Sequence, residues 1–73
     1  MDVFDEEDHV LIIAEMPGVD AKDVLIDLNQ DILTLTAETE RRKYKKEVLL
    51  PREFQREGVS ISSKNGIVRI QCV

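Results

Sequence analysis

The sequence predicts an all-β fold in which about six to eight short antiparallel strands form a two-layer sandwich. Its apolar residues occur in short runs rich in Val, Ile, Leu and Thr, each bounded by turn residues, as is typical of strands. These runs seldom show the i, i+3, i+4, i+7 spacing of an amphipathic helix. Two turn-forming dipeptides, Pro17-Gly18 and Asn65-Gly66, separate such runs. A chain with this many short strands and turns is expected to fold as a sandwich.

The first strands lie before the Pro17-Gly18 turn. Residues 9–16, HVLIIAEM, are almost continuously apolar, which predicts a strand with both faces partly covered. Residues 3–5 would add a short edge strand. Proline followed by glycine suits the centre of a type II turn, because glycine accepts the positive φ that this turn requires. We therefore expect the first long strand to end at this turn.

The acidic connection after the turn leads into a hairpin. Asp20 is expected to cap one helical turn over 21–23 through its carboxylate. Residues 24–28 then form a strand at a sheet edge, and 29–31 connect it to a strand over 32–38. Alternation places on one face of the first of these strands the side chains of Val24, Ile26 and Leu28.

The last part of the chain is expected to hold three further strands. Residues 44–50 end at a proline, which lacks an N–H for strand pairing. The polar connection 52–58 is expected to contain one helical turn, with Gly58 free to take a positive φ. Residues 59–63 and 67–72 then form a hairpin, because the Asn-Gly between them favours a two-residue turn.

Composition indicates one small globular domain over residues 1–73. At 73 residues the chain is near the lower size limit for an independently stable core, so we expect its stability to be shared with a partner or a second copy. Apolar residues make up 42% and charged residues 34%, which is typical of a soluble domain. No stretch is apolar enough to span a bilayer, and residues 1–9 are acidic rather than basic. A cytoplasmic location and no membrane partner are expected.

The sequence offers few groups for catalysis or metal binding. With one cysteine, Cys72, and one histidine, His9, it holds no Cys/His set for a metal. It also lacks a Ser/His/Asp arrangement around His9 and a glycine-rich phosphate loop. We expect no enzyme activity, cofactor, metal or small-molecule substrate. Cys72 is interpreted as a small apolar residue that closes the last strand; a redox-sensitive thiol is the alternative.

The most biased segment is 41–46, RRKYKK, with five cations around Tyr44. Nucleic-acid binding would use the cations for phosphates and Tyr44 for stacking. The net charge of −5 and the lack of a second aromatic residue nearby favour a solvated turn instead. We therefore expect no nucleic-acid partner.

A third interpretation of this basic segment is electrostatic docking. The acidic run Asp5–Asp8 could meet it within one molecule or between two. Contact between two copies would give a weak dimer whose association decreases at high salt. The residues of this candidate self-association surface are Arg41, Arg42, Lys43 and Tyr44.

Three motifs resemble the α-crystallin domain of the small heat shock proteins. The family's hydrophobic strand, Pro-Gly-Val turn, acidic connection and second strand are matched by AEMPGVDAKDVLIDLNQDILTLTAE. The family's Leu-Pro, which follows its middle strand, is matched by Leu50-Pro51. The Asn-Gly of the family's last hairpin is kept within ISSKNGIV, where Ile61 and Val68 replace the family's Ala and Leu. The motif residues are Pro17, Gly18, Val19, Leu50, Pro51, Asn65 and Gly66. The resemblance implies an immunoglobulin-like β-sandwich.

Two departures from the family pattern are visible. Bacterial and archaeal members usually carry a long loop with a strand that swaps into a neighbouring subunit, whereas only the short connection 39–43 is present here. This places strand swapping in doubt, and the compact outline resembles the CS domain of co-chaperones. The sequence also begins at the first strand and ends at the last, without the family's N-terminal arm or C-terminal Ile-x-Ile tail. That outline is expected of an excised domain or an unusually short member.

The resemblance implies an ATP-independent holdase that binds exposed apolar segments of unfolding proteins and self-associates. In the family, a hydrophobic groove holds such segments by adding an extended peptide to a sheet edge. By position, this groove would be lined by Val24, Ile26, Leu28, Val59 and Ile61; alternatively, these side chains only fill the core. The alternative function is a CS-type adaptor module that binds one folded partner through a sheet face, which the short 39–43 connection favours.

Overall fold

The protein consists of seven strands and two short 3-10 turns, and the computed structural model describes all residues 1–73. The strands are β1 (Asp2–Asp5), β2 (Val10–Glu15), β3 (Val24–Asn29), β4 (Ile32–Glu38), β5 (Lys43–Leu49), β6 (Val59–Lys64) and β7 (Ile67–Cys72). The 3-10 turns are η1 (Ala21–Asp23) and η2 (Arg56–Gly58). The all-β prediction is therefore confirmed.

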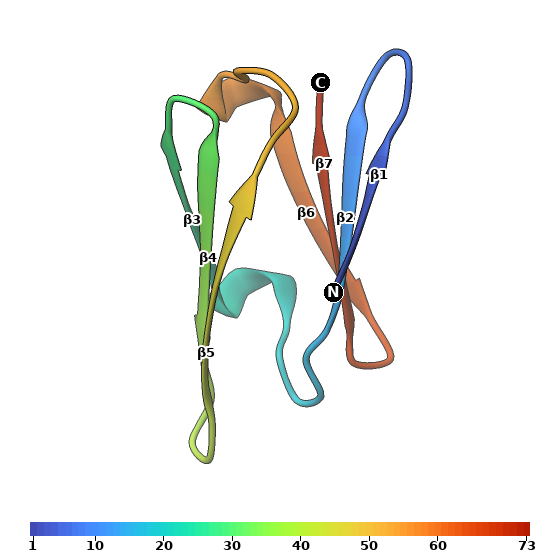
Figure 1. The fold of residues 1–73 in the computed structure, drawn as a ribbon. Helices are drawn as coiled ribbons and strands as arrows, with labels where there is room; N and C mark the ends of the chain where they lie inside the picture. The colour runs from blue at the N-terminus through green and yellow to red at the C-terminus, as the bar shows by residue number, and fades with distance from the viewer.

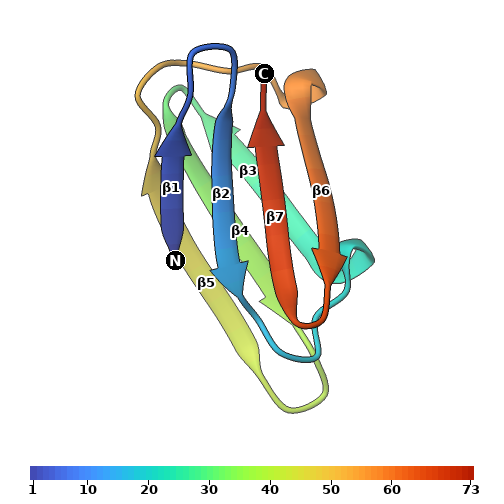
Figure 2. The same cartoon turned by 90° about the vertical axis from the view of Figure 1, so that its right-hand side faces the viewer.

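The strands form two antiparallel sheets that face each other (Figure 1). One sheet has the order β1-β2-β7-β6 and the other the order β3-β4-β5. The chain crosses from the first sheet to the second after the Pro17-Gly18 turn and returns to it through the connection that contains η2 (Figure 1). Figure 2 shows β1 and β5 at one side of the sandwich, and β6 and β3 at the other. Each side thus presents the free edges of two strands.

Two of the turns have the backbone geometry that their residues predict. Gly18 has a φ of 85°, and the N–H of Val19 donates to the carbonyl of Met16 at 3.1 Å, as in a type II turn. Asn65 and Gly66 have φ values of 53° and 78° in the hairpin between β6 and β7. A third positive φ, 59° at Gln30 in the β3–β4 hairpin, was not predicted from the sequence.

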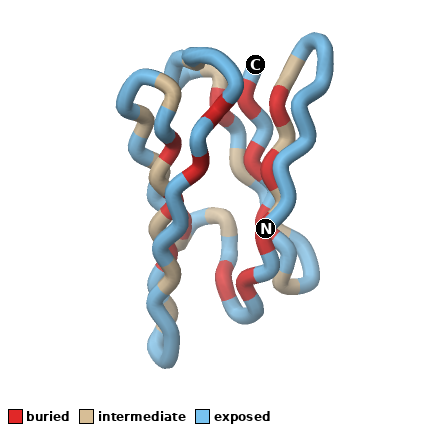
Figure 3. The backbone as a smooth tube through the Cα atoms, viewed as in Figure 1, coloured by how far each residue is buried: buried red, intermediate tan, exposed pale blue.

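The core lies between the two sheets and contains no polar side chain. Fifteen residues are buried and all of them are apolar, so no buried charge or amide needs a partner inside the sandwich. They lie mainly on alternate positions of the strands, as the buried segments in Figure 3 show. Burying a side chain of valine to phenylalanine size contributes about 1.5–3 kcal/mol relative to leaving it exposed, and this layer is the main source of stability.

Gly58 does not use the positive φ that a glycine is free to take. Only Gly18 and Gly66 among the glycines have a positive φ. Gly58 ends η2, where its carbonyl accepts the N–H of Val73 at 3.0 Å, and a Cβ built on it would collide with the carbonyl oxygen of Val73. Glycine is needed here for space beside the C-terminal backbone, not for its conformational freedom.

Candidate peptide-binding groove

The candidate groove lies at the side of the sandwich where β3 and β6 are the edge strands of their sheets. β3 pairs only with β4, and β6 pairs only with β7. Figure 2 shows that they run in opposite directions along this side. Each strand therefore has one edge whose backbone groups are free to pair with an added strand.

The five residues expected to line the groove differ in burial. Val24 and Val59, the first residues of the two strands, are only 6% and 8% exposed and belong to the core. Ile26, Leu28 and Ile61 are partly buried and pack against that core. These three side chains thus keep surface that a ligand can contact, whereas the two valines lie beneath it.

One end of the groove is bridged by a hydrogen bond between η1 and β6. The N–H of Ala21 donates to the hydroxyl oxygen of Ser63 at 3.0 Å. Within η1, the carboxylate of Asp23 accepts the N–H of Asp20 at 3.2 Å, and the N–H of Asp23 donates to the carbonyl of Asp20 at 2.9 Å. The predicted turn therefore holds the start of β3 at a fixed distance from the end of β6.

The other end of the groove opens into a shallow hollow. Leu28 and Gln30 line it from the β3–β4 hairpin, and Phe54 and Arg56 line it from the connection before β6. Phe54 is half-buried against the core, and the guanidinium of Arg52 lies 4.9 Å from the centre of its ring. This cation–π contact holds the aromatic ring at the mouth of the groove.

The sequence reasoning missed two residues of this region, Ser63 and Phe54. Phe54 is the only apolar side chain between Pro51 and Gly58, and that isolation in a polar connection was an available signal. Ser63 gave no signal, because its hydroxyl matters only through the bond to Ala21, which is distant in sequence.

The motif residues around the Pro-Gly and Asn-Gly turns are brought together. The N–H of Met16 donates to the carbonyl of Gly66 at 2.7 Å, and a Cβ on Gly66 would lie 3.3 Å from the Cα of Pro17. Val19 is 3% exposed. The two turns thus pack against each other at one end of the four-stranded sheet.

The Leu50-Pro51 motif closes β5. Leu50 is buried, and its N–H donates to the carbonyl of Asp31 at 2.7 Å. Pro51 is exposed directly after it. This pair therefore ties the end of β5 to the β3–β4 hairpin, and the proline stops further pairing.

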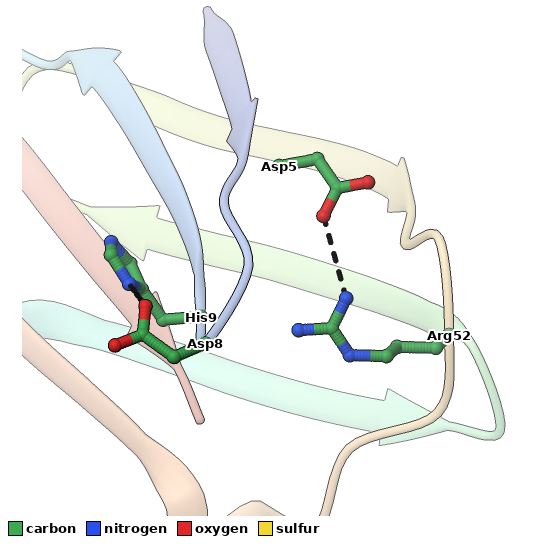
Figure 4. A network of polar contacts seen from close by, with 4 residues as sticks. All are labelled: Asp5, Asp8, His9 and Arg52. Atoms are coloured by element: carbon green, nitrogen blue, oxygen red, sulfur yellow. Dashed lines mark hydrogen bonds and ion pairs between the residues drawn. The ribbon is translucent and has the colours of Figure 1, made fainter.

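The acidic run makes two polar contacts (Figure 4). The carboxylate of Asp5 lies 3.4 Å from Nη1 of Arg52, and that of Asp8 lies 2.7 Å from Nδ1 of His9. The hydrogen bond from His9 lowers the pKa of the Asp8 carboxyl below its usual value. The Asp8 carboxylate therefore favours its ionised form beside this partner.

The docking of the acidic run onto the basic segment within one molecule is wrong. The β1–β2 turn and the β4–β5 turn lie at opposite ends of the sandwich (Figure 1). Arg41, Arg42 and Lys43 are exposed, whereas Tyr44 is half-buried and packs against the core. The ring of Tyr44 is thus partly withdrawn from the surface.

The thiol of Cys72 lies in the core on the last strand. It is fully buried, and burial raises its pKa above the usual value. A thiol of this kind is protonated and poorly reactive. The location agrees with the interpretation of Cys72 as an apolar residue that closes β7.

Residues 2–73 match the Hsp20/alpha crystallin family. The chain belongs to this family. The resemblance carried by the Pro-Gly-Val, Leu-Pro and Asn-Gly motifs is therefore confirmed. Members of this small heat shock protein family are chaperones and are not generally enzymes.

The individual relatives are distant in sequence. The chain is 24% identical over 84 residues to the probable 15 kDa heat shock protein of Leptospira interrogans serogroup Icterohaemorrhagiae serovar Lai (strain 56601), covering 96% of this chain. It spans 65% of the length of that curated relative.

Solved structures share the fold of this small heat shock protein domain. Heat shock protein 16.0 from Schizosaccharomyces pombe has a TM-score of 0.78 at 20% identity, over 97% of this chain and 81% of that one. The hspA of Xanthomonas axonopodis has a TM-score of 0.80 at 21% identity, over 97% and 87%. A small heat-shock protein from Xylella fastidiosa has a TM-score of 0.76 at 21% identity, over 97% and 80%.

In the chain described here, no helix has the length and apolar character of a membrane span.

Proposed function

We propose that this domain is an ATP-independent holdase that captures exposed apolar segments of unfolding proteins in the groove between β3 and β6. The observation that carries the proposal is the coincidence of two free strand edges with three half-exposed apolar side chains, Ile26, Leu28 and Ile61. Family membership supports a chaperone role in general terms. The Asn-Gly and Pro-Gly turns hold the surrounding strands in place.

The proposed capture uses only elementary forces. An extended peptide pairs its backbone with a free edge and places alternate side chains toward Ile26, Leu28 and Ile61. Each Å² of apolar surface removed from water contributes roughly 25 cal/mol. Because burial and edge hydrogen bonds suffice, the mechanism needs no nucleotide and no bond-breaking step.

The partners proposed are unfolding clients and further copies of the chain. The Xylella fastidiosa relative is described as having a distinct high order structure, which supports self-association as a property to test here. We also propose that residues 1–73 act as a single α-crystallin-type domain. The cytoplasmic location stays a prediction.

The direct test is an NMR titration of the labelled protein with a short peptide that contains Ile-x-Ile. Isoleucines two residues apart project on the same side of a strand, so both can enter the groove. We expect saturable shifts at the amides of 24–28 and 59–63, and none with a peptide that carries aspartate at both isoleucine positions. A folded sample that shows no shifts with the first peptide would count against the groove.

A matched pair of variants tests the same groove by activity. Ile26→Asp places a charge among half-buried apolar groups, and we expect the folded variant to lose suppression of client aggregation. Leu25→Asp is the control, because Leu25 is on the same strand but faces outward and is 70% exposed. Full suppression by a folded Ile26→Asp variant would contradict the assignment.

A CS-type adaptor is the second candidate, and one observation favours it. The outer face of the four-stranded sheet carries apolar side chains: Phe4 and Ile67 are 44% and 40% exposed, and Leu11 and Ile13 are partly exposed between them. A folded partner would bury this face. Under the adaptor hypothesis, Leu11→Asp abolishes partner binding while Ile26→Asp preserves it.

A further inference from the structure

The groove between β3 and β6 is closed at one end and open at the other. At the closed end, the bond from the Ala21 N–H to the Ser63 hydroxyl joins η1 to β6. At the open end, the connection that contains η2 lies at the same end of the sandwich as the β3–β4 hairpin (Figure 1). A peptide bound in the groove therefore has room to continue past Leu28, toward the hollow that Phe54 lines.

The free edge of β6 is partly occupied by the chain itself at this open end. The N–H of Val59, the first residue of β6, donates to the carbonyl of Arg56. The carbonyl of Val59 accepts a hydrogen bond from Nη1 of Arg56 at 3.2 Å. Because both backbone groups of Val59 already have partners, we expect a strand added at the open end to pair with β3 instead.

Backbone direction shows which residues of β3 can pair with an added strand. The N–H of Leu50 donates to the carbonyl of Asp31, directly before β4, at 2.7 Å, so odd-numbered positions of this strand bond toward β5. Successive residues of a strand bond to opposite sides, and the even-numbered positions of β4 therefore bond toward β3. Their partners are the odd-numbered positions of β3. Ile26 and Leu28 thus direct their N–H and C=O groups to the free edge.

This pairing geometry sets the spacing of the side chains that a peptide inserts. All strand pairs of the chain are antiparallel, and we expect an added strand to continue that pattern. Opposed residues of an antiparallel pair point to the same face, so peptide residues two apart lie over Ile26 and Leu28. A further step of two reaches Gln30, which lines the hollow together with Phe54. In an antiparallel peptide, this third residue precedes the other two.

The hollow combines apolar and polar groups in a volume of about 460 Å³. Its apolar side chains are those of Leu28 and Phe54. An aromatic side chain with one polar atom, that of tryptophan or tyrosine, suits this mixture, because the ring buries apolar surface while its N–H or O–H bonds to a polar group. The polar residues that line the hollow are Gln30, Glu53, Gln55 and Arg56.

Phe54 is held in a position to receive such a ring. Its side chain is half-buried against the core, and the guanidinium of Arg52 lies 4.9 Å from the ring centre. Arg52 in turn donates to the carboxylate of Asp5 at 3.4 Å (Figure 4). It lines a second hollow beside Phe54, which Val73 also lines, and not the hollow with Leu28. The surface of Phe54 on the groove side is thus not covered by Arg52.

We propose that Phe54 forms a third subsite at the open end of the groove, and that this subsite takes an aromatic side chain two residues before an apolar pair. The preferred client segment is then aromatic-x-apolar-x-apolar in an extended conformation. The subsite depends on the holdase function proposed above, for which it names the class of segment captured. Ile26 and Leu28 bind the apolar pair, and Phe54 determines the preference for the aromatic residue before it.

The test compares three capped peptides by isothermal titration calorimetry, with serine at each x. We expect Trp-x-Ile-x-Ile to bind roughly tenfold more tightly than Ala-x-Ile-x-Ile, because only the first buries an aromatic ring against Phe54. The reversed peptide Ile-x-Ile-x-Trp, bound antiparallel, would carry its tryptophan to the closed end. It should therefore bind no more tightly than the alanine peptide.

The two phenylalanines of the chain provide a matched pair of variants. Phe54→Ala should remove the preference for the tryptophan peptide and leave the affinity for the alanine peptide unchanged. Phe4→Ala is the control, since Phe4 is 44% exposed on β1, away from the groove, and the preference should persist. Circular dichroism establishes folding. If Phe54→Ala does not fold, Phe54→Leu keeps an apolar side chain there and should still lose most of the preference.

Tryptophan fluorescence reports whether the aromatic side chain itself is bound. The chain contains no tryptophan, so all tryptophan emission comes from the peptide. We expect the emission of Trp-x-Ile-x-Ile to move to shorter wavelength when the peptide binds the unmodified chain, because the indole leaves water. With Phe54→Ala the shift should be smaller.

The outcomes separate the subsite from the groove. Equal affinities of the tryptophan and alanine peptides for the unmodified chain would overturn the subsite and leave the groove intact. A folded Phe54→Ala variant that keeps the full preference would do the same. Tighter binding of the reversed peptide would contradict the antiparallel direction. If neither of the first two peptides binds, the groove itself is wrong, and the subsite is wrong with it.

Discussion

The hydroxyl oxygen of Ser63 accepts the N–H of Ala21 at 3.0 Å, although the two residues are 42 positions apart in the sequence. Through this bond β6 of one sheet holds η1, the turn from which β3 of the other sheet begins. A polar contact between an irregular segment and an edge strand thus joins the two sides of the candidate groove at this end.

Ser63→Ala should loosen that end. Removing the acceptor leaves the half-buried Ala21 N–H without its partner, and we expect the free energy of unfolding to fall by about 0.5–1.5 kcal/mol. Urea unfolding measures the loss, and hydrogen exchange should show faster exchange at the Ala21 amide. Ser62→Ala, at an exposed position on the same strand, should change neither.

Gly58→Ala should destabilise the C-terminal end of β7. The added Cβ would collide with the carbonyl oxygen of Val73, and the backbone must shift, which we expect to cost about 1–3 kcal/mol. Thermal unfolding followed by circular dichroism is the measurement. A variant as stable as the parent would mean that the Val73 carbonyl moves away without cost. The Val73 amide would then also stay as protected from hydrogen exchange as it is in the parent.

Gln30→Gly should instead raise the free energy of unfolding. Gln30 has a φ of 59°, and this left-handed conformation costs a residue with a Cβ about 1–2 kcal/mol. Glycine removes that strain but loses about 0.5–1 kcal/mol through its larger conformational freedom when unfolded. We expect a net gain of up to about 1 kcal/mol in chemical unfolding. Gln30→Ala provides the comparison, because it retains the Cβ and should give no gain.

Cys72 should make stability fall at alkaline pH. Burial raises the pKa of its thiol in the folded state, so the folded chain keeps its proton where the unfolded chain loses it. This contribution is fully present below the unfolded pKa of about 8.5 and is lost as the pH rises from there through the folded value. Urea titrations across this range should show the fall, and Cys72→Ala should flatten it. A thiol-reactive reagent should label Cys72 slowly in the folded chain and rapidly in the unfolded chain.

The fold was largely predictable because its strands carry strong local signals. The alternation around Leu33 and Leu35 and the turn chemistry at Gly18 and Gly66 depend only on neighbouring residues, and the structure confirms them. The reason for a glycine at position 58 was not predictable, because its constraint comes from Val73, which no local pattern reveals. The strain at Gln30 was also invisible, since a glutamine gives no sign of a positive φ.

For the candidate groove, the sequence predicted which side chains of β3 face inward but not how deeply each of them is buried. Alternation correctly places Val24, Ile26 and Leu28 on the inward side of β3. It does not distinguish the valine at the start of the strand, which the opposite sheet covers, from the residues that remain half-exposed at the edge. That difference depends on how far the two sheets overlap, which is a property of tertiary packing.

The pairing of β2 with β7 has a consequence for how the chain is made. β2, the most continuously apolar strand, lies in the middle of its sheet between β1 and β7, and its partners Ile67 to Cys72 are near the end of the chain. At about 5–20 residues per second of synthesis, several seconds separate the two strands. During that interval the edge of β2 that β7 later covers has no partner in the nascent chain. A protein from a chaperone family therefore exposes an apolar strand edge, a site for aggregation, while it is being synthesised.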